Sequence, residues 1–361
     1  MGHGTWGKAL GARQTGTRGK TLDSLTGTDM SEPVVTLDDI REAAGRIRPL
    51  ARVTPLLTVE DGGRPLALKC ENLQRSGAFK IRGAANMLLQ LRPEERERGV
   101  ITFSSGNHGI AMSLAASLIS CPAIVVMPTT APAVKVETAR KLGAEIIFEG
   151  TTTIERKARA EAEATARGLT IMPPFDHPWI IAGQGTIGLE ILEQAPEAAA
   201  VCVPTSGGGL LSGVATAIKS LAAHVRVIGV EPACTPRMTR SLTAGHPVTV
   251  PGAAGVADGL LAVRPGDITF AQIQSYVDEI VTVDDDAIID AVRWVFDRAR
   301  LVAEPSGAAA IAAALARGRT SWSRDGASAA EMVEGPIVAV ISGGNVETAA
   351  FCSYITQGTV A

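Results

Sequence analysis

The sequence contains few aromatic residues and no excess of basic charge. Phe, Trp and Tyr make up 4% of the 361 residues, and the formal net charge at pH 7 is −3. Proteins that bind nucleic acids normally carry a basic excess or a basic patch, and neither is visible here. We therefore expect no nucleic-acid partner.

Paired cysteines are also missing. The chain has five cysteines, and each stands alone in the sequence: Cys70, Cys121, Cys202, Cys234 and Cys352. An odd, scattered set with no CxxC pair indicates neither a disulfide framework nor a zinc site. We interpret these residues as reduced thiols of a cytoplasmic protein.

One long uncharged stretch requires a check for a membrane span. No Asp, Glu, Lys or Arg occurs in residues 99–134, but this stretch contains SSGNHG and Pro122. It divides into strand, loop, helix and strand, and a fully buried parallel sheet gives the same signal as a span. We expect no membrane partner. Residues 1 to about 30 are rich in Gly and Thr and lack the apolar core of a signal peptide, so we expect a flexible tail.

Short apolar runs alternate with Ala-rich helical segments over most of the chain, which predicts an α/β fold of mostly parallel sheets flanked by helices. Residues 94–176 contain a compact set of three expected strands with their helices. The Pro-rich IMPPFDHP (171–178) then provides a crossing between domains. We predict a small domain at 94–176 and a large domain made of 31–93 and 177–361.

The segments with chemical potential are four loops, and ligands of such folds bind at the carboxyl ends of strands. The loops are SGAFKIRGA (76–84), SSGNHG (104–109), TSGGGLLSG (205–213) and SGGN (342–345). The Gly-rich loop follows the apolar run AVCVP and opens a helix. Its free N–H groups and the helix dipole favour a phosphate.

A dinucleotide site is the alternative for the Gly-rich loop. Gly207, Gly209 and Gly213 approximate a GxGxxxG pattern, and Glu231 ends the next expected strand, where a ribose-binding acid belongs. A second such pattern, GQGTIG (183–188), follows no clear strand, and we interpret it as the start of a helix.

Lys80 distinguishes between phosphate ligands. It lies between Phe79 and Ile81 in a run of small residues, where a lysine has no obvious reason to face solvent. A desolvated lysine has a lowered pKa and becomes a usable amine nucleophile, as imine formation requires. The backbone amides of SSGNHG could bind a carboxylate, and Ser105 offers a hydroxyl.

Together, these loops and several longer segments resemble the fold-type II pyridoxal 5′-phosphate (PLP) enzymes, specifically the threonine/serine dehydratase (ammonia-lyase) and serine racemase group. The resemblance extends from about Val35 to Val346. It includes the segments ENLQRSGAFKIRGA, TAPAVKVETARKLGAEI, IAGQGTIGLEIL and EPSGAAAIAA. It implies a two-domain fold like that of the tryptophan synthase β subunit, with PLP as cofactor.

The resemblance also implies individual roles. Lys80 would form the imine beside Phe79, Asn107 would bind the phenolic oxygen of the cofactor, Ser342 would bind its pyridine nitrogen, and Glu304 would face it. The phosphate would lie against Ser206, Gly207, Gly208, Gly209 and Leu210. The substrate carboxylate would lie against Ser104, Ser105, Gly106, Asn107 and His108.

Ser342 favours one reaction type. A hydroxyl cannot hold a protonated pyridinium as an aspartate does, so the ring is a weaker electron sink and prompt loss of a β-leaving group is favoured. We expect Lys80 to take the Cα proton and the β-hydroxyl to leave, giving a 2-keto acid and ammonia from a substrate such as L-threonine or L-serine. Serine racemization, with Ser105 protonating the opposite face, and 3-hydroxyaspartate dehydration are the alternatives. An NAD-binding oxidoreductase is a more distant alternative.

Two further expectations concern metal and partners. Racemase-like relatives place metal-binding acids at the position of Glu231 and at the position that Arg237 occupies here. A guanidinium cannot ligate a cation, so we expect no metal and a pairing of Arg237 with Glu231. We expect a small amino-acid substrate, selected by residues around Phe175 and His177, and a homodimer or higher homo-oligomer.

Overall fold

The computed structural model describes residues 34–61, 64–104, 106–131, 133–316, 321–323 and 335–356. The predicted tail at residues 1–30 and the predicted site residue Ser105 lie outside this set. No helix among the described residues is long and apolar enough to cross a bilayer.

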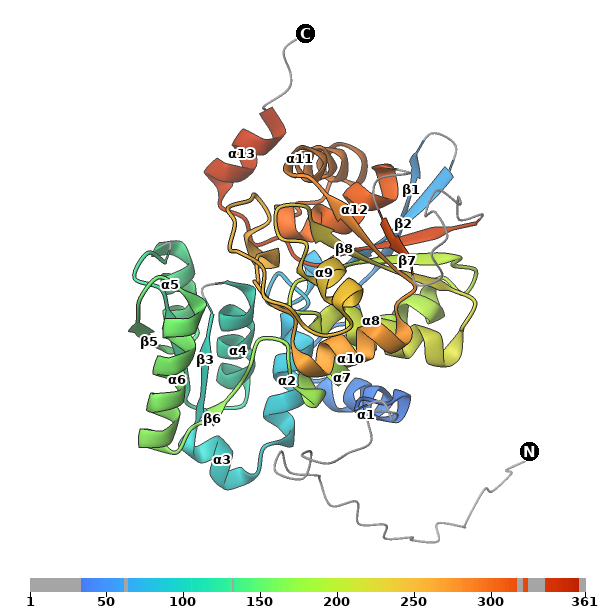
Figure 1. Ribbon diagram of the computed structural model, residues 1–361. Coiled ribbons are helices and arrows are strands. Elements are labelled where there is room, and N and C mark those ends of the chain that lie inside the picture. The colour runs from blue at the N-terminus through green and yellow to red at the C-terminus, as the bar shows by residue number, and fades with distance from the viewer. Residues whose placement is uncertain are drawn as a thin grey trace, which may run out of the picture. The chain divides into compact units, whose positions relative to one another are not determined.

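A seven-stranded sheet forms the centre of the larger layered part of the molecule, with strand order β1-β2-β11-β7-β8-β9-β10 (Figure 1). Its strands are β1 (Leu56–Asp61), β2 (Arg64–Cys70), β7 (Ala200–Pro204), β8 (Arg226–Pro232), β9 (Glu279–Val283), β10 (Ser321–Ser323) and β11 (Ile337–Ile341). The two edge pairs, β1 with β2 and β10 with β9, are antiparallel, and all other pairs are parallel.

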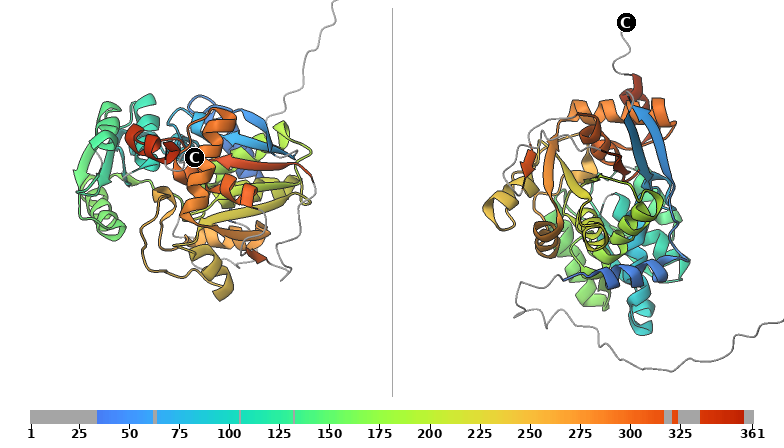
Figure 2. Two further views of the ribbon diagram at one scale, coloured as in Figure 1. Left: turned by 90° about the horizontal axis from the view of Figure 1, so that it is seen from above. Right: turned by 90° about the vertical axis from the view of Figure 1, so that its right-hand side faces the viewer.

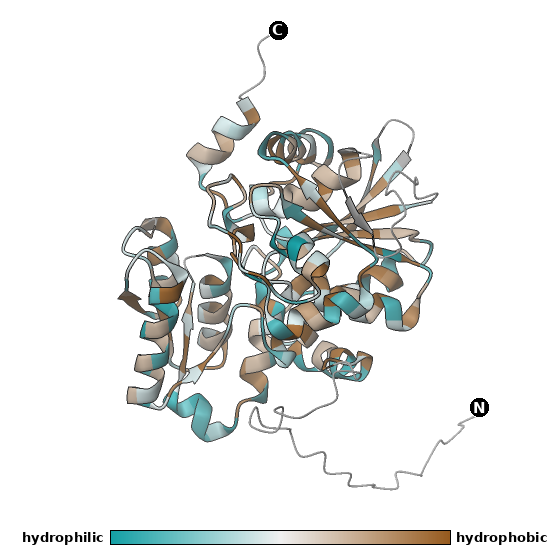
Figure 3. Cartoon of the chain, viewed as in Figure 1, coloured by the Kyte–Doolittle hydropathy of each residue, from teal (hydrophilic) through white to brown (hydrophobic). Residues whose placement is uncertain are grey.

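Both faces of this sheet are buried, because successive side chains of a strand point to opposite faces. Val338 and Val340 of β11 pack with one apolar cluster, and Ala339 and Ile341 pack with another. The first cluster includes side chains of α7, α8 and α10, and the second those of α11, α12 and α13. Figure 3 shows the strands of this sheet mostly in the colour of hydrophobic residues. Such strands read as continuous apolar runs, which is why the sequence predicts them.

A second, four-stranded sheet is wholly parallel, with order β5-β4-β3-β6. Its strands are β3 (Val100–Phe103), β4 (Ala123–Met127), β5 (Glu145–Phe148) and β6 (Thr170–Ile171). The expectation of three strands here is wrong by one, because β6 is only two residues long. The boundaries of the two predicted domains stay a prediction.

Helices cover both sheets and lie on either side of the strands (Figures 1 and 2). The helices are α1 (Leu37–Ile47), α2 (Lys80–Gln90), α3 (Pro93–Arg98), α4 (Asn107–Leu118), α5 (Ala133–Lys141), α6 (Thr153–Arg167), α7 (Pro178–Gln194), α8 (Gly209–Leu221), α9 (Arg237–Ala244), α10 (Asp267–Tyr276), α11 (Asp285–Trp294), α12 (Pro305–Ala316) and α13 (Thr348–Thr356). Short helical turns lie at η2 (Glu71–Leu73), η3 (Asp258–Leu260) and η4 (Val295–Ala299).

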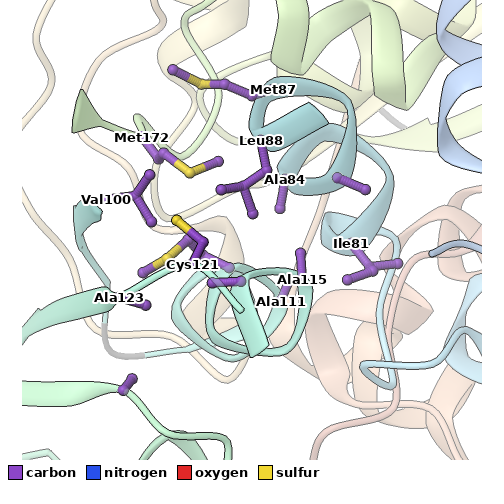
Figure 4. Close-up of a cluster of buried hydrophobic side chains, with 14 of the residues drawn as sticks. Ile81, Ala84, Met87, Leu88, Val100, Ala111, Ala115, Cys121, Ala123 and Met172 are labelled. Carbon is purple, nitrogen blue, oxygen red and sulfur yellow. The ribbon is translucent and has the colours of Figure 1, made fainter. Parts of the chain in front are cut away.

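Helix α2 is held by the apolar core of the four-stranded sheet. Ile81, Ala84 and Leu88 of α2 pack with residues of α4, β3 and β4, as Figure 4 shows. Lys80 is the first residue of this helix, and the residues that follow it are buried. Their packing therefore fixes the position of the Lys80 backbone.

The interpretation of GQGTIG (183–188) as a helix start is wrong. Helix α7 begins at Pro178, after His177 caps it, and the glycines lie inside the helix. A Cβ on Gly183 would lie 2.6 Å from the carbonyl oxygen of Arg82, and one on Gly188 would lie 2.8 Å from Ala217. These glycines allow close helix packing rather than phosphate binding.

Candidate active site

The strand order brings three of the predicted loops together. In the larger sheet, β11 lies between β2 and β7 and runs parallel to both, so the segments that follow these strands leave the same edge. The backbone N–H of Phe79 donates to the carbonyl oxygen of Ser342 at 3.0 Å, and Ala78 forms a β-bridge with Gly343. The lysine segment and the SGGN segment are therefore joined by backbone contacts.

Lys80 carries an amine without a carboxylate partner among the described residues. Its Nζ donates to the carbonyl oxygen of Pro174 at 2.6 Å and lies 5.1 Å from the centre of the Phe79 ring. Desolvation lowers the pKa of Lys80 to about 8. A larger share of this amine is thus neutral near physiological pH than for an ordinary lysine.

The buried Lys69 has a different environment from Lys80. Its Nζ is 2.5 Å from the carboxylate of Glu190 and also donates to the carbonyl oxygen of Thr54. Glu190 also pairs with Arg82, which in turn pairs with Glu71. Lys69 therefore belongs to a buried ion network, whereas the half-buried Lys80 is available as a nucleophile.

The segment Ser206–Leu210, called the phosphate loop below, follows β7 and leads into α8. Gly208 precedes this helix with a φ of +103° and, because it has no side chain, leaves the N-terminus of the helix uncapped. Among the described residues, the backbone N–H groups of Gly208, Gly209 and Leu210 donate to no protein acceptor. A Cβ on Gly207 would overlap the ring of Phe175, and one on Gly209 would lie 2.9 Å from its Cβ. Only glycine fits here, and the free amides are complementary to a phosphate.

Asn107 and Glu304 meet at the SGGN segment. Asn107 Nδ2 donates to Glu304 Oε1 at 2.5 Å, and Asn345 Nδ2 donates to Asn107 Oδ1 at 2.8 Å. A Cβ on Gly343 would lie 3.2 Å from Asn107 Nδ2, so the backbone after Ser342 passes directly beside this pair. Burial raises the pKa of Glu304 to about 8, and the hydrogen bond from Asn107 opposes that rise. Glu304 is therefore largely uncharged at neutral pH.

In the segment SSGNHG (104–109), which was predicted to bind the substrate carboxylate, some of the backbone amides already have acceptors within the protein. The backbone N–H of Ser104 donates to Val126 in the neighbouring strand, and that of Gly106 donates to the hydroxyl of Ser104. Helix α4 begins at Asn107 without a side-chain cap, so the amides of Asn107 and His108 have no acceptor among the described residues. Of the four described residues at positions 104–108, Asn107 and His108 therefore have the amides that remain free for an anion.

The expected pairing of Arg237 with Glu231 is wrong. Glu231 accepts hydrogen bonds from the backbone N–H groups of Met238 and Thr239, at 2.9 Å each, and so caps α9. Arg237 instead donates to backbone carbonyl oxygens, one of them in the phosphate loop. The carboxylate that resembled a ribose-binding acid, at the end of β8, is thus engaged with the first turn of α9. The described residues contain no group of three or more His, Cys, Asp or Glu able to hold a metal ion.

Three residues near the site have no clear sequence signal. Pro174 accepts the hydrogen bond of Lys80, Asp176 caps α10 by accepting from Asp267, Ile268 and Thr269, and Thr269 binds the phosphate loop. Pro174 and Asp176 flank Phe175, which was expected near the substrate. His177, also expected there, accepts a hydrogen bond from the N–H of Trp179 and starts α7.

Comparison with known proteins finds relatives of this chain. The family model described as pyridoxal-phosphate dependent enzyme matches residues 47–343. The chain is 41% identical to an L-threonine ammonia-lyase of Thermotoga maritima over 91% of this chain and 80% of that protein. It is 40% identical to a serine racemase of Oryza sativa subsp. indica over 86% of this chain and 91% of that protein. The solved structure of maize serine racemase superposes with a TM-score of 0.82 at 38% identity, covering 88% of this chain and 96% of that one.

Proposed function

The chain belongs to the pyridoxal-phosphate dependent enzyme family, and from that premise we propose that it eliminates water from a small β-hydroxy amino acid. The dehydrated product would then take up water and hydrolyse to a 2-keto acid and ammonia. The observation that carries the proposal is the unpaired amine of Lys80, with its pKa lowered to about 8, at the loop edge that also carries the uncapped N-terminus of α8. An L-threonine ammonia-lyase of Geobacter sulfurreducens, 41% identical to this chain, also supports it.

The described residues fit the cofactor. We propose that the free amides of the phosphate loop bind its phosphate, that Lys80 holds its reactive carbon, and that Asn107 and Ser342 contact the ring. The Ser206 hydroxyl accepts from Ala262 at 3.3 Å, so its own hydrogen remains available to a phosphate oxygen. When bound, PLP supplies an aldehyde that combines with the substrate amine and draws electrons from its α-carbon.

The substrate is oriented by the start of α4. The amides of Asn107 and His108 point out of the first turn of an uncapped helix, where a carboxylate is stabilised by the dipole. Held there, the amino acid presents its α-hydrogen to Lys80. The neutral Nζ of Lys80 then accepts that proton, and its lowered pKa makes this proton transfer feasible near neutral pH.

Elimination is favoured because the groups near the cofactor ring carry little negative charge. Ser342 is buried, and its hydroxyl donates to the carbonyl oxygen of Ser306 at 3.4 Å. Glu304 keeps its proton until about pH 8. With no ionised carboxylate beside it, PLP bound here would be a weaker electron sink, and it would favour reactions in which the substrate loses a β-substituent promptly over those that hold charge on the α-carbon.

Racemization is the second candidate, and the similarity to serine racemases supports it. It needs a proton donor on the face of the α-carbon opposite Lys80. We propose Ser105 for this role, in line with its position in SSGNHG. Dehydration of 3-hydroxyaspartate is a third possibility, supported by the 38% identity to an L-threo-3-hydroxyaspartate ammonia-lyase of Saccharomyces cerevisiae.

A substrate panel separates these activities. The purified holoenzyme is incubated with L-threonine, L-serine and L-threo-3-hydroxyaspartate, and ammonia, keto acid and D-amino acid are measured together. We expect keto acid and ammonia in equal amounts, exceeding any D-amino acid. Production of D-serine without ammonia would make racemization the main activity. The Lys80→Ala variant serves as the control and should produce neither.

The assembly and the location of the protein stay predictions. We propose a homodimer or higher homo-oligomer in the cytoplasm. Analytical ultracentrifugation of the holoenzyme measures the first, and a monomer at micromolar concentration would contradict it.

A further inference from the structure

Arg237 is a fully buried arginine without an ion pair among the described residues. Its Nε donates to the carbonyl oxygen of Ser206 at 3.1 Å, and one terminal nitrogen donates to that of Thr205 at 2.7 Å. The other terminal nitrogen donates to the carbonyl and hydroxyl oxygens of Thr235, at 2.5 and 2.8 Å. The nearby carboxylate of Glu231 opposes the lowering of the pKa of Arg237 by burial, but it accepts no hydrogen bond from the guanidinium among the described residues. A buried charge is costly, so an arginine whose hydrogen bonds all go to neutral oxygens needs an explanation.

The neighbouring carbonyl is held in the same way by α10. The carbonyl oxygen of Gly207 accepts from the hydroxyl of Thr269 at 2.6 Å and from the backbone N–H of Gly266 at 3.1 Å. Three consecutive carbonyls, those of Thr205, Ser206 and Gly207, are therefore bound on the protein side of the loop.

These bonds determine where the N–H groups of the phosphate loop point. The described residues contain no cis peptide bond, and in a trans peptide the C=O and the following N–H point in opposite directions. Binding the carbonyls of Thr205, Ser206 and Gly207 into the protein thus turns the N–H groups of Ser206, Gly207 and Gly208 away from it. None of these three N–H groups has a protein acceptor among the described residues.

Charge supports the same conclusion. The phosphate loop itself contains no charged residue, and Arg237 is the only charged side chain that hydrogen-bonds to it among the described residues. The N–H groups supply partial positive charges, and the guanidinium adds a full one on the far side of the same peptide planes. Polarising a peptide through its carbonyl strengthens the N–H at its other end.

We propose that Arg237 is a positioning residue for the cofactor phosphate: it fixes the peptides of the phosphate loop with their N–H groups outward and stands as a built-in cation behind them. The proposal rests on the assignment of the phosphate to this loop under the proposed function. Arg237 does not touch the cofactor, so its effect is confined to binding of the phosphate group.

Binding of two ligands that differ only in the phosphate tests this role. The apoenzyme is titrated with pyridoxal 5′-phosphate and with pyridoxal, and both dissociation constants are read from the visible absorbance of the bound ligand. For Arg237→Met we expect the dissociation constant for pyridoxal 5′-phosphate to rise roughly ten- to hundredfold, the scale of a lost charge-assisted hydrogen bond. That for pyridoxal should change less than about threefold. Arg240→Met, an exposed arginine one turn further along α9, is the matched control and should change neither.

Equal changes for the two ligands, or no change for either, would overturn the proposal. If Arg237→Met gives no folded apoenzyme, Arg237→Lys decides. It keeps the charge but has a single nitrogen in place of the fork that reaches Thr205 and Ser206, so a smaller selective loss is expected, and equal losses overturn the proposal.

Gly208→Ala separates this inference from the assignment on which it rests. Gly208 has a positive φ, and a Cβ there would lie 2.8 Å from Thr269, so the variant distorts the loop directly. A selective loss of phosphate-dependent binding in Gly208→Ala but not in Arg237→Met refutes only the role of Arg237. No selective loss in either variant refutes the location of the phosphate.

Discussion

Replacing Glu304 with glutamine should remove a pH-dependent cost to stability. Glu304 is 6% exposed, and the hydrogen bond to its side chain comes from the Asn107 amide. Glutamine keeps an oxygen that can accept this bond, so the variant mimics the protonated acid. Burial is the main cause that raises the pKa of Glu304 from 4.5 to about 8, and nearby Asp258 acts in the same direction.

The sign follows from which state holds the proton. Between pH 4.5 and about 8 the folded protein retains a proton on Glu304 that the unfolded chain has released, so stability falls as pH rises. Each pH unit in this window costs about 1.4 kcal/mol. Allowing for the curvature at both ends, the wild type should lose about 3 to 4 kcal/mol between pH 5 and pH 8 through this group. Above the folded pKa the loss is complete.

Urea unfolding of the apoenzyme measures this difference. Wild type, Glu304→Gln and the control Glu60→Gln, which changes an exposed carboxylate, are compared at pH 5, 6, 7 and 8. The stability of Glu304→Gln relative to wild type should increase with pH by the amount above, and that of Glu60→Gln should stay level. A constant offset for Glu304→Gln would show that Glu304 is ionised at neutral pH, and the argument for an uncharged cofactor environment would then fail.

Three further predictions concern the site. The rate at which apoenzyme takes up PLP should rise with pH, reach half of its maximum near pH 8 and level off above it, because the neutral amine of Lys80 is the reacting form; a stopped-flow rate that is flat from pH 6 to 9 would contradict this. Gly207→Ala should destabilise the apoenzyme by about 1 to 3 kcal/mol in urea unfolding through overlap with Phe175, and Phe175→Ala should relieve part of that loss; additive effects would contradict the contact. Ser105→Ala should abolish D-serine formation but keep keto-acid formation, and parallel loss of both products on chiral chromatography would refute its role as the second proton donor.

Much of the fold follows from the sequence because its strands are buried on both faces. The runs AVCVP, RVIGVE and IVAVIS are apolar at nearly every position, and each becomes a parallel strand of the larger sheet. The two-residue strand β6 carries no such signal, since two residues are too few to show a pattern and their partners, Val100 and Ile101 of β3, lie far away in the sequence. The same holds for the glycines of GQGTIG, whose partners Arg82 and Ala217 lie on other helices.

Several residues of the candidate site could be predicted from the sequence, but not all of their contacts. Lys80, Asn107, Glu304 and Ser342 follow from motifs and resemblance, and the structure joins their segments through direct hydrogen bonds. The partner of Arg237 could not be predicted in this way. Opposite charges near each other in sequence suggest an ion pair, but the N-terminus of α9 competes for Glu231, and the guanidinium binds the carbonyl oxygens of Thr205, Ser206 and Thr235.

The attachment site of the cofactor tests the central claim most directly. Holoenzyme is reduced with borohydride, which fixes the cofactor to the amine that holds it, and is then digested and analysed by mass spectrometry. The account predicts the added mass on the peptide that contains Lys80. Added mass on the fully buried Lys69, or on no lysine at all, would contradict it.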